Sequence, residues 1–173
     1  MRASDVIATL RTLVRKGKAT RSWHDPNELA RTALRFIEPQ AVHAGARLLS
    51  ELADGLPPVQ VDPIQIEQVV LNLVRNALDA VGTLPDGTRR EVRVGTRLHA
   101  PGKVEFYVAD RGPGIDAAGG AAVFDEFFTT KPDGLGLGLS ISRSIVDAHG
   151  GQLWLDTAAG PGATFRFTLP ATS

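Results

Sequence analysis

The chain has 173 residues, and its 19 basic and 19 acidic side chains leave no net formal charge, so it has no bulk attraction for nucleic acid or an anionic membrane surface. A hydrophobic fraction of 43% without cysteine fits a globular domain in a reducing compartment, and it excludes a disulfide scaffold and thiolate metal sites. No apolar run approaches the roughly 20 residues of a membrane helix, so we expect a cytoplasmic location with no direct membrane contact from this chain.

Apolar residues near the N-terminus recur at helical spacing, which predicts an amphipathic helix over residues 4–16. Its stripe consists of Val6, Ile7, Leu10, Leu13 and Val14. A single stripe has to be buried, either against a partner helix or by folding back on its own domain, and the pattern does not decide between the two. Residues 18–24 are polar and basic, which is typical of a linker or a short edge strand.

Two further helices are predicted to begin with the same device, a capping aspartate followed by a proline at the first helical position. The first follows Asp25 and is predicted to end at Pro39. Its buried face consists of Leu29, Ala33, Phe36 and Ile37. The second follows Asp62 and runs to about Val81. Its buried stripe consists of Ile66, Val70, Leu73, Ala77 and Val81.

The second of these helices also carries a polar row on a different face. Gln68, Asn72, Asn76 and Asp79 recur at spacings of three and four residues, so their side chains lie along one side of the helix. Asparagine competes with the backbone for hydrogen bonds and has poor helix propensity. Two asparagines one turn apart in the middle of a helix therefore call for an explanation.

Alternation of apolar and polar residues predicts strands along the rest of the chain. The strands are residues 46–52, 58–61, 91–98, 104–108, 153–155 and 164–169. Pro101-Gly102 predicts a hairpin between the strands 91–98 and 104–108, and a last helix is predicted over residues 138–149. Because strands and helices do not alternate strictly, we predict an α+β fold: a two-layer α/β sandwich with a mixed, mostly antiparallel sheet covered by helices on one face.

Two glycine-rich turns flank an aromatic segment in the second half of the chain. They are residues 110–115 and 134–139, with Phe124, Phe127 and Phe128 between them. Glycine lets a backbone approach a ligand closely, and a helix that begins at the second turn directs free N–H groups at an anion. A Walker phosphate loop and a dinucleotide fingerprint are both absent. The turns predict a nucleotide pocket of another kind, although each alone could be an ordinary turn.

Taken in order, these motifs resemble those of the catalytic ATP-binding domain of sensor histidine kinases, in the Bergerat-fold ATPase superfamily with gyrase and MutL. The matching segments are similar to the N box (71–77), the G1 box (110–115), the F box (124–128), the G2 box (134–139) and the last glycine box (160–165). The resemblance implies a catalytic ATP-binding domain over residues 23–171. Residues 1–22 resemble the tail of a dimerisation helix and a linker, so Met1 is expected to begin a fragment.

The resemblance also implies a role for each matching residue. Asp110 would accept a hydrogen bond from the adenine amino group, and Thr164 would support it, through water. Asn76 would hold Mg²⁺, for which an amide oxygen is a suitable hard ligand. Asn72 would face the same phosphates, and the resemblance implies that Asn72 and Asn76 are the catalytic residues. Phe127 and Phe128 are expected to anchor a lid against the core.

The phosphates would lie against backbone N–H groups of Gly136 and Gly138. Lys131 could pair with a terminal phosphate, or it could be a solvated loop charge. Asp79 departs from the basic residue that many relatives carry, which puts a direct phosphate contact there in doubt. The full predicted ATP-binding set is Asn72, Asn76, Asp79, Asp110, Gly112, Gly114, Ile115, Lys131, Gly134, Leu135, Gly136, Leu137, Gly138 and Thr164.

Two features separate phosphate transfer from hydrolysis. Members of the superfamily that hydrolyse ATP carry a glutamate at the position of Asn72, and asparagine is a poor general base. In addition, no histidine of this chain is followed by glutamate, and His24-Asp25 falls at a helix cap, so the chain lacks its own phosphate acceptor. We therefore expect a histidine kinase that presents the γ-phosphate of Mg-ATP to a histidine outside this chain.

The resemblance implies three partners. They are the dimerisation and histidine-phosphotransfer domain of the same protein, the receiver domain of a response regulator, and a second copy of the full-length protein in a homodimer. Two alternatives stay open: a stand-alone Bergerat-fold ATPase, and a non-catalytic interaction module that has lost its nucleotide.

Overall fold

The computed structural model describes residues 20–115, 120, 122–125, 127, 136–159 and 161–172. The helix predicted over residues 4–16 lies outside the described residues. The elements, in chain order, are β1 (Ser22–His24), α2 (Pro26–His43), β2 (Arg47–Leu52), β3 (Val59–Val61), α3 (Pro63–Gly82), β4 (Glu91–Ala100), β5 (Lys103–Asp110), α5 (Gly138–Ala148), β6 (Gln152–Leu155) and β7 (Thr164–Pro170).

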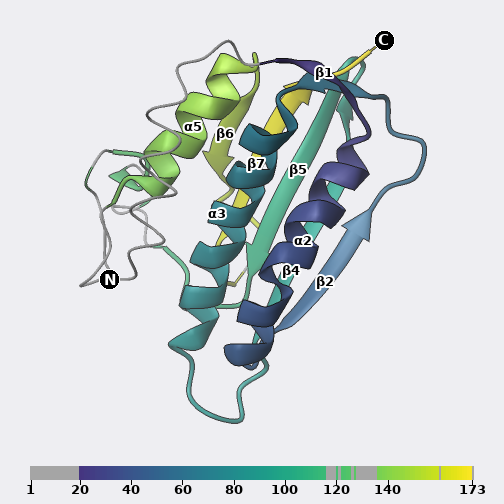
Figure 1. The fold of residues 1–173 in the computed structure, drawn as a ribbon. Coiled ribbons are helices and arrows are strands. Elements are labelled where there is room, and N and C mark those ends of the chain that lie inside the picture. Colours follow the sequence, from purple (N-terminus) through teal and green to yellow (C-terminus); the bar gives the residue numbers. More distant parts are fainter. Residues whose placement is uncertain are drawn as a thin grey trace.

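A five-stranded sheet with the order β2-β4-β5-β7-β6 forms one layer of the domain. β2 pairs with β4 in parallel, and the other neighbours are antiparallel. The three described helices lie on one face of this sheet, with α3 between α2 and α5 (Figure 1). β1 and β3 form a separate two-stranded sheet. The predicted α+β sandwich with a mixed, mostly antiparallel sheet is confirmed.

The apolar core lies between the helices and the inner face of the sheet. Val94, Phe106 and Phe167 are at most 1% exposed, and the Phe106 and Phe167 rings stack with their centroids 4.7 Å apart. The whole predicted stripe of α3 is buried against them, so this part of the sequence pattern is confirmed. No helix among the described residues is long and apolar enough to span a bilayer.

The two capped helix starts are also confirmed. The Asp25 carboxylate accepts from the backbone N–H of Asn27, and the Asp62 carboxylate accepts from those of Ile64 and Gln65, at 2.8, 3.0 and 3.3 Å. These bonds satisfy N–H groups that have no partner within the helix.

Two predictions about α2 are wrong. The helix passes through Pro39 and ends at His43, because Pro39 lies on the exposed side and removes one backbone bond, while buried Ala41 holds the last turn against the core. Phe36 is 71% exposed, and Ile37, the next residue, is fully buried instead. The buried stripe of α2 therefore includes Ile37 and Ala41 but not Phe36.

Candidate functional site

Asp110 ends β5 and is almost completely buried, with 6% of its surface exposed. Its Oδ1 accepts hydrogen bonds from the backbone N–H groups of Gly112 and Ala163, at 2.8 and 3.3 Å. Both of these bonds go to Oδ1, and no donor among the described residues contacts Oδ2. Burial raises the pKa of the Asp110 carboxyl above its ordinary value, and the two N–H donors only partly offset this rise.

The segment before β7 closes tightly on Asp110. Gly162 has φ +85°, and a Cβ at this position would lie 1.9 Å from the backbone oxygen of Asp110. The backbone N–H of Asp110 in turn donates to the oxygen of Ala163 at 2.9 Å. Only glycine fits a positive φ at such a short approach. The last glycine motif, through Gly162 and Ala163, therefore fixes the backbone at Asp110.

Ala163 is a site residue that the sequence did not indicate, because it contributes only backbone groups. The strand pairing does not support the prediction that Thr164 assists Asp110, and this role stays a prediction. Thr164 pairs with Ala109, whereas Asp110 pairs with Val92 of the inner face. Since successive side chains of a strand point to opposite faces, the side chains of Thr164 and Asp110 leave the sheet on opposite sides.

Helix α3 lies against both glycine turns. A Cβ on Gly112 would lie 2.9 Å from the Cβ of Ala80, near the C-terminal end of α3. One end of the predicted pocket is thus packed directly on this helix. Asn72 and Asn76, earlier on α3, are half-buried, whereas Asp79 is exposed.

The start of α5 forms the other end. Leu137 is its N-cap residue and makes no side-chain bond to the helix. The first N–H groups of a helix have no partner within it, so they are available to an anion. Gly136, Leu137 and Gly138 of the predicted phosphate cradle are described here. Gly134, Leu135 and Lys131 lie outside the described residues.

Asn72 joins α3 to α5. Its Nδ2 donates to the Oγ of Ser142 at 3.0 Å. Its Oδ1 faces the start of α5, where a Cβ on Gly138 would lie 2.5 Å away. Together with the Ala80–Gly112 contact, this places the asparagine row of α3 between Asp110 and the start of α5.

The aromatic segment differs from its prediction. Phe127 is 71% exposed, so the prediction that it anchors the lid against the core is wrong, and Phe128 lies outside the described residues. Phe124 makes the anchoring contact instead, edge-on to buried Phe165 with centroids 6.1 Å apart, and Arg143 of α5 lies 5.4 Å from its ring centre. The backbone N–H of Phe127 donates to the oxygen of Gly136 at 3.0 Å, which ties this segment to the second glycine turn.

A pocket of about 340 Å³ lies beside the Asp110 turn rather than over α3. Gly114, Ile115, Gly162 and Ala163 line one side of it, and residues 155–157 line another. Because none of its lining residues comes from α3, we define the candidate site by its side chains and not by this pocket. Among the described residues no group of three or more His, Asp or Glu side chains could hold a metal ion, and the role of Asn76 as a magnesium ligand stays a prediction.

Comparison with known proteins finds one protein family and sensor proteins as relatives. The model of the family "Histidine kinase-, DNA gyrase B-, and HSP90-like ATPase" matches residues 61–173. Sensor protein FixL of Bradyrhizobium diazoefficiens is 40% identical over 99% of this chain and 33% of its own length. The C4-dicarboxylate transport sensor protein DctS of Rhodobacter capsulatus is 39% identical over 98% of this chain and 25% of its own length. The chain thus spans a third or less of these curated relatives.

Solved structures agree. Full-length ShkA in complex with AMPPNP has a TM-score of 0.81 and 29% identity, over 98% of this chain and 35% of its own. The catalytic domain of histidine kinase ThkA has a TM-score of 0.76 and 32% identity, over 88% of this chain and 96% of its own. The chain belongs to the histidine kinase-, DNA gyrase B- and HSP90-like ATPase family, and it corresponds to the catalytic ATP-binding domain of sensor histidine kinases.

Proposed function

We propose that this domain binds Mg-ATP across α3 and the two glycine turns and presents the γ-phosphate to a histidine on a dimerisation domain outside this chain. That histidine would attack in line, and the domain would contribute positioning and charge stabilisation. The observation that carries the proposal is the contact of α3 with both glycine turns, through Ala80 with Gly112 and through Asn72 with Gly138.

Each end of the site has its own task in this proposal. Oδ2 of Asp110 accepts from the adenine amino group, and the first N–H groups of α5 bind phosphate oxygens. Asn76 contributes an amide oxygen to the magnesium ion, which commonly keeps phosphates and waters as its other ligands. When bound, the ion neutralises charge on the transferred phosphoryl group.

The identity of Asn72 favours transfer over hydrolysis, because an amide cannot take a proton from water as a carboxylate can. A stand-alone ATPase would instead show appreciable turnover of ATP by this domain alone. A non-catalytic module would show no binding of Mg-ATP in calorimetry. The buried carboxylate of Asp110 and the uncapped start of α5 support nucleotide binding over either alternative.

We further infer that the acceptor domain belongs to the same full-length protein, that this protein is a homodimer, and that the phosphate then passes to the receiver domain of a response regulator. Support comes from a solved complex of histidine kinase ThkA with response regulator TrrA, which has a TM-score of 0.73 and 28% identity over 98% of this chain and 49% of its own. A cytoplasmic location fits a chain without cysteine.

The test mixes the domain with γ-labelled ATP, Mg²⁺ and a separately produced dimerisation domain of the same protein, and measures phosphohistidine. We expect Asn76→Ala to abolish transfer. Arg75→Ala is the matched control, because Arg75 is the preceding residue of α3 and lies on its exposed side. Transfer by the Asn76→Ala variant at the rate of the wild type would contradict the metal assignment, and absence of transfer by the wild type would contradict the function.

A further inference from the structure

The side chain of Asn72 is held between two residues of α5 that lie one helical turn apart. Its Nδ2 donates to the Oγ of Ser142 at 3.0 Å. At Gly138, an added Cβ would lie 2.5 Å from Oδ1 and 3.1 Å from Cγ of the same amide. Gly138 thus leaves the room for the amide, and Ser142 gives it a hydrogen-bond partner.

Ser142 stands out on the inward face of α5. Its neighbours on this face, Ile145 and Val146, are buried and apolar, and Ser142 itself is 2% exposed. A hydroxyl buried this deeply needs a partner, because leaving it without one costs more free energy than the bond gains. The other two serines of α5 bond to backbone oxygens of their own helix, Ser140 to Leu137 and Ser144 to Ser140, whereas Ser142 bonds across to α3.

The bond fixes where the amide of Asn72 lies. An asparagine side chain has a donor end and an acceptor end, and a serine hydroxyl can bond either of them. In the structure Nδ2 faces Ser142, and Oδ1 faces the start of α5. The same bond also ties the helix that carries Asn76 to the helix that carries the phosphate cradle.

We propose that Ser142 is a positioning residue for phosphate transfer, which acts by holding the amide of Asn72 in a fixed place between α3 and α5. The inference rests on the proposed function, since it concerns Mg-ATP at that site. Ser142 itself does not touch the nucleotide. Without its hydroxyl, the amide of Asn72 can turn, and α3 and α5 lose a fixed contact between the metal end and the phosphate end of the site.

The test is a double-mutant cycle on Ser142→Ala and Asn72→Ala, with the Mg-ATP dissociation constant and the rate of phosphohistidine formation as readouts. We expect Ser142→Ala alone to weaken one or both by roughly three- to tenfold, the usual effect of a single hydrogen bond. In the Asn72→Ala background, the same substitution should have no further effect, because the group that it positions is absent. Ser142→Cys, which keeps a weak acceptor, should lie between the wild type and Ser142→Ala.

Ser144→Ala is the matched control, since it removes an exposed hydroxyl of the same helix with a bond to its own helix. Thermal unfolding without nucleotide identifies a merely structural effect. If Ser142→Ala matches the wild type, or causes the same loss with and without Asn72, the inference is overturned while the proposed function stands. If the wild type binds no Mg-ATP, the proposed function is overturned, and the inference with it.

Discussion

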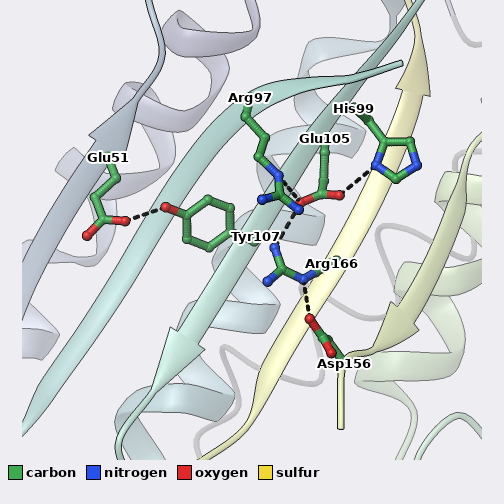
Figure 2. Close-up of polar contacts among 7 residues, drawn as sticks. All are labelled: Glu51, Arg97, His99, Glu105, Tyr107, Asp156 and Arg166. Carbon is green, nitrogen blue, oxygen red and sulfur yellow. Dashed lines mark hydrogen bonds and ion pairs between the residues drawn. The ribbon is translucent and has the colours of Figure 1, made fainter. Parts of the chain in front are cut away.

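Strand β5 carries two buried carboxylates that lie on opposite faces of the sheet and in opposite electrostatic surroundings. Glu105, on the outer face, is fully buried, with the cationic groups of Arg97 and Arg166 and the ring of His99 all 2.8 Å from its oxygens (Figure 2). Asp110, on the inner face, has two backbone N–H donors and no ion pair among the described residues. The first carboxylate has its partners within the fold, and the second still has an oxygen to offer.

The pKa directions follow this difference. Burial alone would raise the pKa of Glu105, but the hydrogen bonds from Arg97 and His99 outweigh it and hold the pKa below its ordinary value. For Asp110 burial prevails, and the pKa is raised. The lowered pKa means that the charge of Glu105 favours the folded state, whereas the raised pKa means that the charge of Asp110 disfavours it, which is common at functional sites. This contrast separates the structural acid from the proposed adenine acceptor.

The outer face extends as one polar network beyond Glu105. Arg166 also donates to Asp156 at 2.7 Å, and its guanidinium carbon lies 5.4 Å from the ring centre of Tyr107. The Tyr107 hydroxyl donates to Glu51 of β2, and burial, together with that carboxylate, raises the pKa of Tyr107 to about 12 (Figure 2). The network thus crosses the sheet from Glu51 of β2 to Asp156, the residue that follows β6.

The largest expected effect is on the inner carboxylate. Asp110→Asn replaces an acceptor oxygen by a possible donor, and we expect it to weaken binding of Mg-ATP by roughly 10- to 100-fold, the loss of a hydrogen bond to a charged group. Because Asp110 is buried without a cation, the same substitution should leave the free energy of unfolding near pH 7 unchanged or raise it. Calorimetry of binding and urea unfolding measure the two effects. A domain that binds normally but is strongly destabilised would place Asp110 with the structural acids.

The next effect concerns the ring that crosses the outer face. Tyr107 lies over Gly95 of β4, where a Cβ would be 2.2 Å from the ring. Gly95→Ala should displace the ring from Glu51 and reduce the free energy of unfolding by about 1–3 kcal/mol, the usual cost of overpacking. Nucleotide affinity should stay unchanged, because the proposed site is on the other face. In the background of Tyr107→Ala, which removes the ring, Gly95→Ala should cost little, and an equal cost there would contradict the steric explanation.

Glu105→Gln tests the ion cluster directly. It keeps the shape of the side chain but removes the charge that its three partners share, and we expect a loss of about 1–2 kcal/mol in the free energy of unfolding. The loss is smaller than for a fully buried pair, because the side chains of Arg97 and His99 are 53% and 41% exposed. Affinity for Mg-ATP should again be unchanged. A stable variant with weakened binding would show that the outer face contributes to the site.

The sequence predicted the parts of this picture that depend on local patterns. Helix caps, the buried stripe of α3 and the strand alternation are local, and each agrees with the structure. The continuation of α2 past Pro39 depends on Ala41 docking in the core, which no local rule contains. Likewise, the alternation of apolar residues in β5 does not predict that Glu105 is buried, because its cover comes from side chains of neighbouring strands.

The candidate site also has parts that local sequence patterns predict and parts that depend on distant contacts. Asn72, Asn76 and Asp110 belong to recognisable sequence motifs, so their positions could be predicted. The contacts that orient them could not, since the bond from Asn72 to Ser142 joins two helices, and the bond from Ala163 to the Asp110 carboxylate is donated by a backbone N–H. A hydrogen bond between distant segments has no signature in a single sequence, and a backbone donor has none at all.

The smallest effect sharpens the comparison by giving the two carboxylates opposite pH dependences. The pKa of Glu105 is lowered in the folded domain, so its stabilisation is fully present above the ordinary value of 4.5 and is lost as the pH falls through the lower, folded value. The pKa of Asp110 is raised, so the folded domain binds its proton more tightly, and its cost to stability appears as the pH rises above the ordinary value of 3.8.

Urea unfolding of the wild type and of both carboxyl-to-amide variants between pH 3 and pH 7 measures these two pH dependences. Lowering the pH should reduce the difference by which the free energy of unfolding of the wild type exceeds that of Glu105→Gln. It should increase the free energy of unfolding of the wild type relative to that of Asp110→Asn. A change of the same sign in both pairs would contradict the assignment of one carboxylate to the fold and the other to the ligand.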